Sequence, residues 1–394
     1  MNTLYFDNNA TTAVAPEVLD EMLPYLRDLY GNPSSMHTFG GQLHKRIEDA
    51  RAKVAGLLGA DPEEIIFTSC GTESDNTAVM SAVESLPQKR HIITSRVEHP
   101  AVLNFFKHLA RKGYRVTLLP VNNQGRLNID DLMKAVDEDT ALVSIMYANN
   151  ETGNIYPVKE IGKILKDRRI LFHSDAVQAV GKIPLDLKTL PVDMLSLSGH
   201  KLHAPKGIGA LYVRKGTRFY PYIIGGHQEK GRRAGTENIA SIIALGKACE
   251  LAMDSLEDES AYLKKLRDKL ETSLLKSCPD VRINGDVGSR LPNTTNVSFE
   301  YVEGEAILLR LNEYGVCASS GSACTSGSLE PSHVLRAMGV PFTAIHGSIR
   351  FSLSRYNTEA EIDRVIEIMP GIISNLRDLS PFGREKIGQT AKCP

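Results

Sequence analysis

One lysine stands between two histidines in the segment 198–203 (SGHKLH). The alternating apolar run 192–197 before it predicts a strand, and residues 210–213 after it predict a second one, so Lys201 is expected where a pair of strands opens. An ammonium group placed there beside apolar walls and other cations loses solvation, and its pKa falls. The free amine is then a nucleophile for a carbonyl group, as a Schiff-base lysine requires. A solvated turn lysine is the alternative at this position.

The segment 69–76 (SCGTESDN) joins a predicted strand, 64–68, to a predicted helix, 74–85. The turn at Gly71 exposes backbone N–H groups near the positive end of the helix dipole, and the Thr72 hydroxyl adds a donor. Such a turn suits a phosphate group, but Ser or Thr before Glu is also the usual composition of a helix N-cap. The residues alone leave both interpretations open.

Three more polar side chains follow predicted strands. His99 can stack on a flat ligand or move protons, and the Asn150 amide can bind a ring oxygen or a carboxylate. Asp175 would be an acid at the end of a buried strand, which requires a cationic partner such as a protonated pyridinium nitrogen. Capping and turn formation are the simpler alternatives for all three.

Strand-like and helix-like segments alternate along the first half of the chain. The expected strands are 64–68, 91–95, 115–119, 141–146 and 170–173, and the expected helices are 16–29, 40–58, 74–85, 101–111, 130–136 and 158–167. This alternation predicts an α/β fold with a large, mostly parallel sheet covered by helices on both faces. Ligands of such sheets bind beyond the carboxyl ends of the strands, where the polar side chains above are expected to meet.

The rest of the chain predicts a second, smaller α+β domain. We assign residues 12–258 to the large domain, and residues 1–11 with 259–394 to the small one. A helix over 238–277 would link the two, with four leucines on one stripe. The other expected elements are strands 281–283, 296–299 and 348–353 and helices 305–312, 331–338 and 358–369.

Two polar segments receive ordinary structural interpretations. Residues 7–12 (DNNATT) precede the helix expected at 16–29, so capping is the simplest role for their Asn and Thr side chains. Residues 225–238 are rich in glycine and arginine, which is typical of a solvated loop, although their donors also suit an anion.

Composition excludes several classes of function. Lys plus Arg number 46 and Asp plus Glu number 47, so no net field attracts nucleic acid or anionic lipid. No apolar run approaches a membrane span, and residues 1–7 lack the features of a signal peptide, so we expect a cytoplasmic protein. The six cysteines are scattered without CxxC pairs. They predict reduced thiols and no metal site.

A segment rich in glycine and serine, about 317–333, follows the second predicted helix of the small domain. Its composition cannot pack a core, which predicts a mobile loop that carries Cys324 within reach of solvent and partners. Protein surfaces tend to avoid a free thiol, so Cys324 in such a loop favours a chemical role over an incidental one.

Taken together, Asp175, Gln178 and the segment 198–201 resemble the fold-type I pyridoxal-phosphate enzymes, a class that contains aminotransferases and cysteine desulfurases. With the Cys324 loop added, the chain closely resembles the cysteine desulfurases. The segments 70–75, 150–153 and 201–207 are most similar to the nitrogen-fixation, NifS-type branch, and the resemblance runs from about residue 5 to about residue 381. It implies pyridoxal 5'-phosphate as cofactor, L-cysteine as substrate and a homodimer.

The resemblance also implies a role for each cofactor residue. Lys201 would bond to the cofactor, and Asp175 would bind its pyridine nitrogen. Gln178 would bind the phenolic oxygen of the ring, and His99 would stack on the ring and move protons. The phosphate would be bound by Gly71, Thr72, Ser198 and His200, with Thr236 supplied by the other subunit.

Substrate binding and sulfur transfer are implied in the same way. Arg350 alternates with apolar neighbours on its predicted strand, so its guanidinium suits either a substrate carboxylate or a structural ion pair, and the resemblance favours the carboxylate. Asn150 would lie close to substrate and ring. Cys324 would take the sulfur as a persulfide, with release of L-alanine, and pass the sulfur to an iron–sulfur scaffold protein, such as one that serves nitrogenase. An aminotransferase or selenocysteine lyase of the same fold is the nearer alternative, and a non-catalytic binding protein the more distant one.

Overall fold

The computed structural model describes residues 3–320 and 331–380. Seven strands form its largest sheet, in the order β2-β8-β7-β6-β5-β3-β4. They are β2 (Ile65–Thr68), β3 (His91–Ser95), β4 (Arg115–Leu119), β5 (Thr140–Ser144), β6 (Leu171–Asp175), β7 (Met194–Ser198) and β8 (Gly209–Val213). Only β8 runs antiparallel to its neighbours in this sheet. The predicted α/β fold with a mostly parallel sheet is confirmed.

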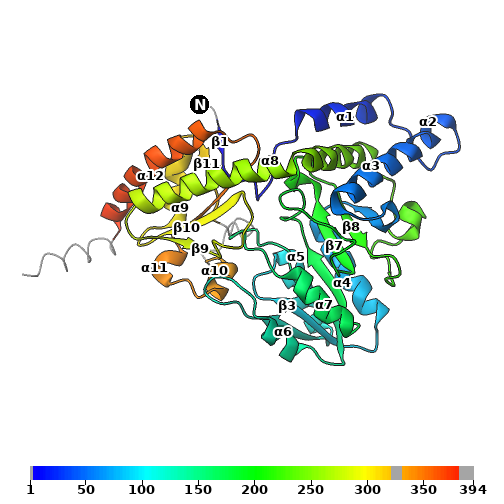
Figure 1. The fold of residues 1–394 in the computed structure, drawn as a ribbon. Coiled ribbons are helices and arrows are strands. Elements are labelled where there is room, and N and C mark those ends of the chain that lie inside the picture. Colours follow the sequence, from blue (N-terminus) through cyan, green and yellow to red (C-terminus); the bar gives the residue numbers. More distant parts are fainter. Residues whose placement is uncertain (1–2, 321–330, 381–394) are drawn as a thin grey trace, which may run out of the picture.

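Helices cover both faces of the large sheet because successive strand residues point to opposite sides. Ile65 packs in one apolar core and Ile66 in another, and Ile93 and Ile92 are divided in the same way. The first core includes α1 (Pro16–Arg27), α3 (Leu43–Leu58), α6 (Ile129–Ala135) and α7 (Val158–Asp167), and the second includes α4 (Gly71–Ser85) and α5 (Pro100–Arg111). A short helix, α2 (Thr38–Gly41), lies before α3. Figure 1 shows the resulting layers.

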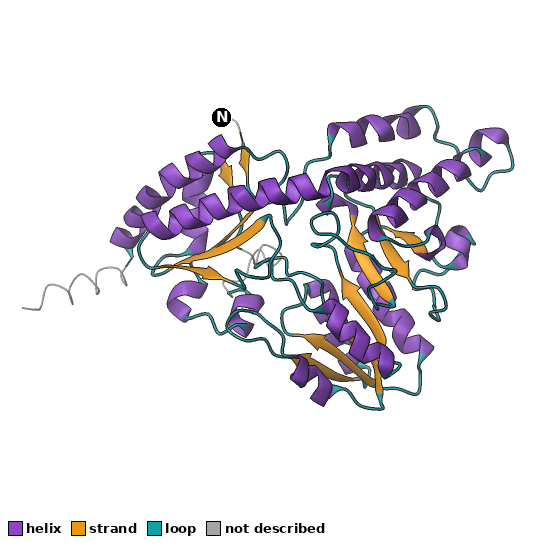
Figure 2. Ribbon diagram, viewed as in Figure 1, coloured by secondary structure: helices purple, strands orange, loops and turns teal. Residues whose placement is uncertain are grey.

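A second group of elements packs around a smaller, antiparallel sheet with the order β12-β10-β9. Its strands are β9 (Val281–Asn284), β10 (Thr294–Phe299) and β12 (Ser348–Ser352), and α9 (Gly304–Glu313) and α12 (Glu359–Leu379) pack in its core. The short helices α10 (His333–Ala337) and α11 (Phe342–Ile345) lie nearby, but their buried residues belong to the first core. The short strands β1 (Leu4–Tyr5) and β11 (Val316–Cys317) pair in parallel beside the small sheet (Figure 2). The N-terminal residues therefore begin next to the small sheet.

The long helix α8 (Ile239–Ser277) contributes to both cores. Ile242 and Leu245 pack against the large sheet, whereas Leu266 and Leu270 pack in the core of the small sheet. In Figure 1, α8 extends from one group of elements to the other. Although α8 is long, neither it nor any other helix of the described residues carries an apolar stretch long enough to cross a membrane. The proposed domain boundary near residue 258 stays a prediction.

Most predicted elements are present, and two helices are longer than expected. Strands 91–95 and 115–119 and helix 158–167 have the predicted bounds. However, α4 begins at Gly71, so the glycine turn belongs to the first turn of the helix. Likewise, α12 continues beyond residue 369 through Pro370. Proline removes a helical hydrogen bond, but the residues after it bury two isoleucines in the core, which offsets that cost.

Candidate active site

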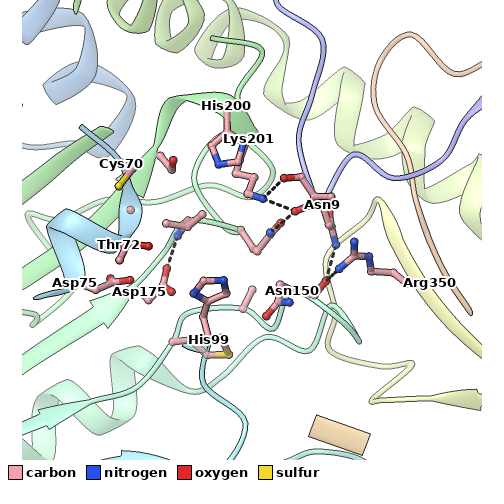
Figure 3. A pocket seen from close by; sticks show the side chains of 17 residues that line it. Asn9, Cys70, Thr72, Asp75, His99, Asn150, Asp175, His200, Lys201 and Arg350 are labelled. Atoms are coloured by element: carbon pink, nitrogen blue, oxygen red, sulfur yellow. Dashed lines mark hydrogen bonds between the residues drawn. The ribbon is translucent and has the colours of Figure 1, made fainter. Parts of the chain in front are cut away.

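A cavity of about 330 Å³ lies beyond the carboxyl ends of β6 and β7, and residues from β12 and the N-terminal segment complete its wall (Figure 3). Its lining residues include Gly71, Thr72, His99, Asn150, Asp175, Gln178, Ser198, His200, Lys201 and Arg350. Two predicted site residues are not among them. Thr236 is exposed and does not line this chain's cavity, and Cys324 lies outside the described residues.

Lys201 ends a single 3₁₀ turn that follows β7, between the antiparallel neighbours β7 and β8, as predicted. Its Nζ donates to the carbonyl oxygen of Asn9 at 2.5 Å and to that of Ala10 at 2.6 Å. The adjacent His200 is largely uncharged at neutral pH, since burial and Lys201 lower its pKa to about 4. Backbone carbonyls therefore hold the amine inside the cavity, and the interpretation as a solvated turn lysine is wrong.

Asp175 is the last residue of β6 and is buried. One carboxylate oxygen, Oδ1, accepts a hydrogen bond from the Val177 N–H at 2.9 Å. Burial raises the pKa of Asp175 to about 6, against the opposing effects of Val177 and Lys201. Asp75, in the first turns of α4, lines the same cavity, and burial and Asp175 raise its pKa well above the usual value. A cation in the cavity would therefore be stabilised by these carboxyl groups.

The first turn of α4 forms one end of the cavity. Cys70 is the residue before α4 and makes no side-chain capping bond, so the N-cap interpretation of this segment is wrong. The Ser198 Oγ is buried and has no hydrogen-bond partner among the described residues. A Cβ at Gly71 would lie 2.8 Å from Val177 Cγ2 and 3.5 Å from Ser198 Cβ. A helix N-terminus, an unused hydroxyl and a position restricted to glycine fit a phosphate group.

His99 is both the N-cap of α5 and a wall of the cavity. Its Nδ1 accepts a hydrogen bond from the Ala101 N–H at 3.2 Å. Burial, Lys201 and His333 lower its pKa to about 4, so the ring is neutral at pH 7. In the neutral tautomer that accepts at Nδ1, the proton is on Nε2. His99 can therefore donate a hydrogen bond into the cavity from Nε2, and Figure 3 draws its ring between Asp175 and Asn150.

Arg350 lies on β12, and its backbone neighbours in that strand pack in the core of the small sheet. Its Nη1 donates to the carbonyl oxygen of Asn150 at 3.0 Å, and its Nη2 to Asp7 Oδ1 at 2.6 Å. The Nε is buried without a hydrogen-bond partner among the described residues. The structural ion pair that the sequence allowed is thus present, and part of the guanidinium still faces the cavity.

The N-terminal segment contributes residues to the cavity that sequence reasoning missed. Ala15 is the N-cap of α1 and makes no side-chain bond, so the capping interpretation of residues 7–12 is wrong. Asn9 and Ala10 instead line the cavity, and the Thr12 Oγ1 accepts a hydrogen bond from the His203 N–H at 2.9 Å. The available signal for these residues is a cluster of polar side chains in a segment without helix or strand periodicity. Because their partners are distant in sequence, this signal does not indicate which residues they contact.

A second lysine lies close behind the cavity. Lys182 Nζ donates to Gln178 Oε1 at 2.8 Å, while Gln178 Nε2 donates to the Asn9 carbonyl oxygen at 3.0 Å. Burial, Lys201 and Arg350 lower the pKa of Lys182 to about 7. Lys182 thereby fixes which end of the Gln178 amide accepts. No residue pattern singled it out.

The described cysteines differ in their surroundings. Cys249 and Cys278 are buried, Cys317 is half-buried on β11, and all of them are free thiols. Cys70, also free, lines the cavity beside Gly71. Figure 3 shows Cys70 and Arg350 at opposite ends of the cavity. Any ligand carboxylate bound by Arg350 would thus lie far from this thiol.

Comparisons with known proteins agree with this geometry. Residues 4–365 match the aminotransferase class-V family. The chain is 64% identical to a cysteine desulfurase of Trichormus azollae over 98% of this chain and 97% of that one. It is 56% identical to cysteine desulfurase NifS of Azotobacter vinelandii over 97% and 95% of the two chains. The solved structure of a NifS-like protein matches with a TM-score of 0.90, at 43% identity, covering 95% of this chain and all of that one. The chain therefore belongs to the aminotransferase class-V family and, within it, to the cysteine desulfurases.

Proposed function

We propose that this cysteine desulfurase binds pyridoxal 5'-phosphate in the cavity and transfers the sulfur of L-cysteine to Cys324. The observation that carries the proposal is the arrangement around one cavity of a lysine amine, a buried carboxyl group and a helix N-terminus with an unused hydroxyl. These are the groups that a cofactor with an aldehyde, a ring nitrogen and a phosphate requires. Family membership supports the same cofactor.

Each part of the cofactor would contact a different set of cavity residues. Lys201 would bond to the aldehyde carbon, Asp175 would bind the ring nitrogen, and Gln178 would donate to the phenolic oxygen. Gly71, Thr72, Ser198 and His200 would bind the phosphate. When bound, pyridoxal phosphate accepts electron density from the substrate's α-carbon. Burial raises the pKa of Asp175 because it destabilises the carboxylate form. A protonated ring nitrogen beside Asp175 would stabilise that carboxylate and lower its pKa again.

The protein's own groups account for binding and proton movement at the substrate. The Arg350 guanidinium would take the substrate carboxylate through the N–H groups that its bonds to Asn150 and Asp7 leave over on Nη1 and Nη2. Lys201 Nζ is the candidate base at the α-carbon, because it lies in the cavity and would be a free amine whenever it is not bonded to the cofactor. His99 Nε2, which can donate into the same cavity, is the candidate proton donor.

Cys324 is the proposed sulfur acceptor. Ser319 pairs with Arg350 through two backbone hydrogen bonds, and the chain from Ser319 to Cys324 can span at most on the order of 15–18 Å. At the other end, Ser332 donates to Glu151, the residue after Asn150. Both attachments support a thiol that can reach the substrate.

The transfer balances without an external oxidant. The Cys324 thiolate attacks the substrate sulfur, an S–S bond forms, and the C–S bond of the substrate breaks. The electron pair of that bond stays with the carbon fragment, which takes up protons and leaves as L-alanine. Cys324 is left as a persulfide, whose terminal sulfur can pass to a thiol of an acceptor.

We also propose a homodimer in the cytoplasm that supplies an iron–sulfur scaffold protein, with a nitrogenase-directed scaffold as one acceptor. Thr236 is exposed and does not contribute to its own cavity, which supports a role in the cavity of a second copy. Leu19, Leu23 and Leu26 of α1 and Met36 also expose apolar surface that a second copy would bury. Sedimentation at several concentrations tests the dimer, and a monomer throughout would contradict it.

The proposed reaction is tested on protein supplied with pyridoxal phosphate. The visible absorbance band of the bound cofactor should change when L-cysteine is added, and with a thiol reductant present to release the persulfide sulfur, sulfide and alanine should form in equal amounts. Cys324→Ala should keep the absorbance band but lose persulfide and sulfide formation. The matched variant Cys70→Ala should keep the band and also form persulfide and sulfide. A band without sulfide would indicate aminotransferase chemistry, and persulfide turnover undiminished in Cys324→Ala would refute the role of Cys324.

A further inference from the structure

The amine of Lys201 is held by the N-terminal segment, far from it in sequence. The carbonyl oxygens of Asn9 and Ala10 lie 2.5 and 2.6 Å from Nζ. Two carbonyl acceptors so close to one ammonium group fix both its position and the direction of its N–H bonds. The Asn9 carbonyl also accepts from Gln178 Nε2. One peptide therefore orients two of the proposed cofactor contacts.

The side chain of Asn9 holds that peptide in place. Asn9 is 2% exposed. Its Nδ2 donates to the Asn150 carbonyl oxygen at 3.1 Å and to Thr294 Oγ1 at 2.9 Å. Its Oδ1 accepts from Asn293 Nδ2 at 3.1 Å, and its backbone N–H donates to Ser352 Oγ at 2.9 Å. The peptide is thus attached to the small sheet at β10 and β12 and, through Asn150, to the loop that follows β5 of the large sheet.

We propose that Asn9 is a positioning residue for Lys201. Its side chain fixes the two carbonyls that hold the lysine nitrogen whenever that nitrogen is not bonded to the cofactor. This inference rests on the proposed function of Lys201, but it assigns a separate task to a residue that does not touch the reacting carbon.

The physical consequence concerns the speed of bond formation at Lys201. A nucleophile held at the correct distance and angle reacts faster than one that samples many positions. Without the Asn9 side chain, the peptide loses its contacts to Thr294 and Asn150, and the carbonyl pair can shift. The residues proposed to bind the phosphate come from other elements, and Gln178 keeps its hydrogen bond from Lys182, so the affinity for a ligand without an aldehyde should change little.

Two probes separate these effects in full-length protein from which the cofactor has been removed. Pyridoxal phosphate reports both binding and bonding to Lys201, whereas pyridoxamine phosphate has no aldehyde and reports binding alone. In Asn9→Ala we expect covalent capture of pyridoxal phosphate at Lys201, followed by absorbance and by peptide mass after borohydride reduction, to be slower by about tenfold or more. The affinity for pyridoxamine phosphate should stay within about twofold.

The control is Asn357→Ala. Asn357 is also a buried asparagine, and its amide bonds to Tyr5 and Asn8 of the same N-terminal segment without contacting Asn9 or Ala10. It should lower stability without a selective effect on capture. Thr294→Val, which removes one acceptor of the Asn9 amide, is the milder second variant and should slow capture in the same direction if Asn9→Ala folds poorly.

Each outcome has a defined meaning. Slow capture with normal pyridoxamine phosphate binding, in Asn9→Ala or Thr294→Val but not in Asn357→Ala, supports the proposal. Unchanged capture, or equal losses with both probes, overturns it. If the unaltered protein fails to capture pyridoxal phosphate at Lys201, the proposed function itself fails, and this result is distinct from the other two.

Discussion

A buried ion pair connects the loop 225–238 to α3, and removing one of its partners should lower the free energy of unfolding. Arg51 Nη1 and Nη2 donate to Glu229 at 2.7 and 2.8 Å, and the Phe67 N–H donates to the same carboxylate at 2.9 Å. The side chains of Arg51 and Glu229 are 7% and 4% exposed. Glu229 and Lys230 also have positive φ angles of 48° and 58°, which are unfavourable for residues other than glycine. The pair therefore maintains a strained loop.

The expected magnitude follows from this burial. Arg51→Met leaves the Glu229 carboxylate buried with one backbone donor, and breaking such a pair costs about 3–5 kcal/mol of the free energy of unfolding. Changing both residues to methionine removes the unpaired charge as well. The loss of unfolding free energy in the double variant should thus be smaller than the sum of the losses in the two single variants, because the double variant replaces the ion pair by apolar side chains of similar volume.

The assay is equilibrium urea unfolding at a fixed protein concentration, because association shifts apparent stability. Arg27→Met is the matched control, since Arg27 pairs with Asp28 at the surface and exposed pairs contribute about 0–1 kcal/mol. A cost below about 1 kcal/mol for Arg51→Met, or additive losses in the double variant, would refute the reasoning. Because Thr236 follows in the same loop, Arg51→Met should also weaken binding of pyridoxal phosphate in the proposed dimer.

Two further predictions concern the cavity, and a third concerns the buried acid Glu98. Gly71→Ala places a Cβ 2.8 Å from Val177 and should weaken pyridoxal phosphate binding by about tenfold or more in an absorbance titration; unchanged affinity would contradict the phosphate site. Arg350→Gln should raise KM for L-cysteine by about 10–100-fold while cofactor capture persists, and sulfide release measures this; an unchanged KM would exclude the carboxylate role. Burial raises the pKa of Glu98 to about 8, so between about pH 4.5 and 8 the folded protein keeps a proton that the unfolded chain has lost, and the free energy of unfolding falls as the pH rises. In urea unfolding at several pH values, Glu98→Gln should reduce this pH dependence by up to about 1.4 kcal/mol per pH unit. An unchanged pH dependence would contradict a buried, protonated Glu98.

The sequence predicted the strands of the large sheet and most of the cavity for a physical reason. Alternating strands and helices imply parallel strands, and the carboxyl ends of parallel strands meet at one edge. Residues at the ends of the strands or just after them, such as Asp175, His99 and Asn150, therefore line one cavity although they are distant in sequence. Local pattern and topology together were sufficient for them.

The contribution of the N-terminal segment could not be predicted in this way. Asn9 and Ala10 line the cavity, and Asp7 pairs with Arg350 at its wall, because β1 pairs with β11 and because Asn8 donates to the Ser352 carbonyl oxygen on β12. These are contacts between the two ends of the chain, and nothing in the local composition specifies them. The same segment was therefore assigned to helix capping. Glu229 was missed for a similar reason, since its partner Arg51 lies on a helix much earlier in the chain.

The structural and chemical roles of the cavity residues are compatible, because each role uses a different atom. His99 caps α5 with Nδ1, which leaves Nε2–H for the cavity. Asp175 accepts the Val177 N–H at Oδ1, which leaves its second oxygen for the proposed ring nitrogen. Arg350 uses one N–H of Nη1 for Asn150 and one N–H of Nη2 for Asp7, which leaves the second N–H of each nitrogen for a carboxylate. The structural bond fixes the orientation of each group, so the remaining atom is presented to the ligand at no further cost in side-chain entropy.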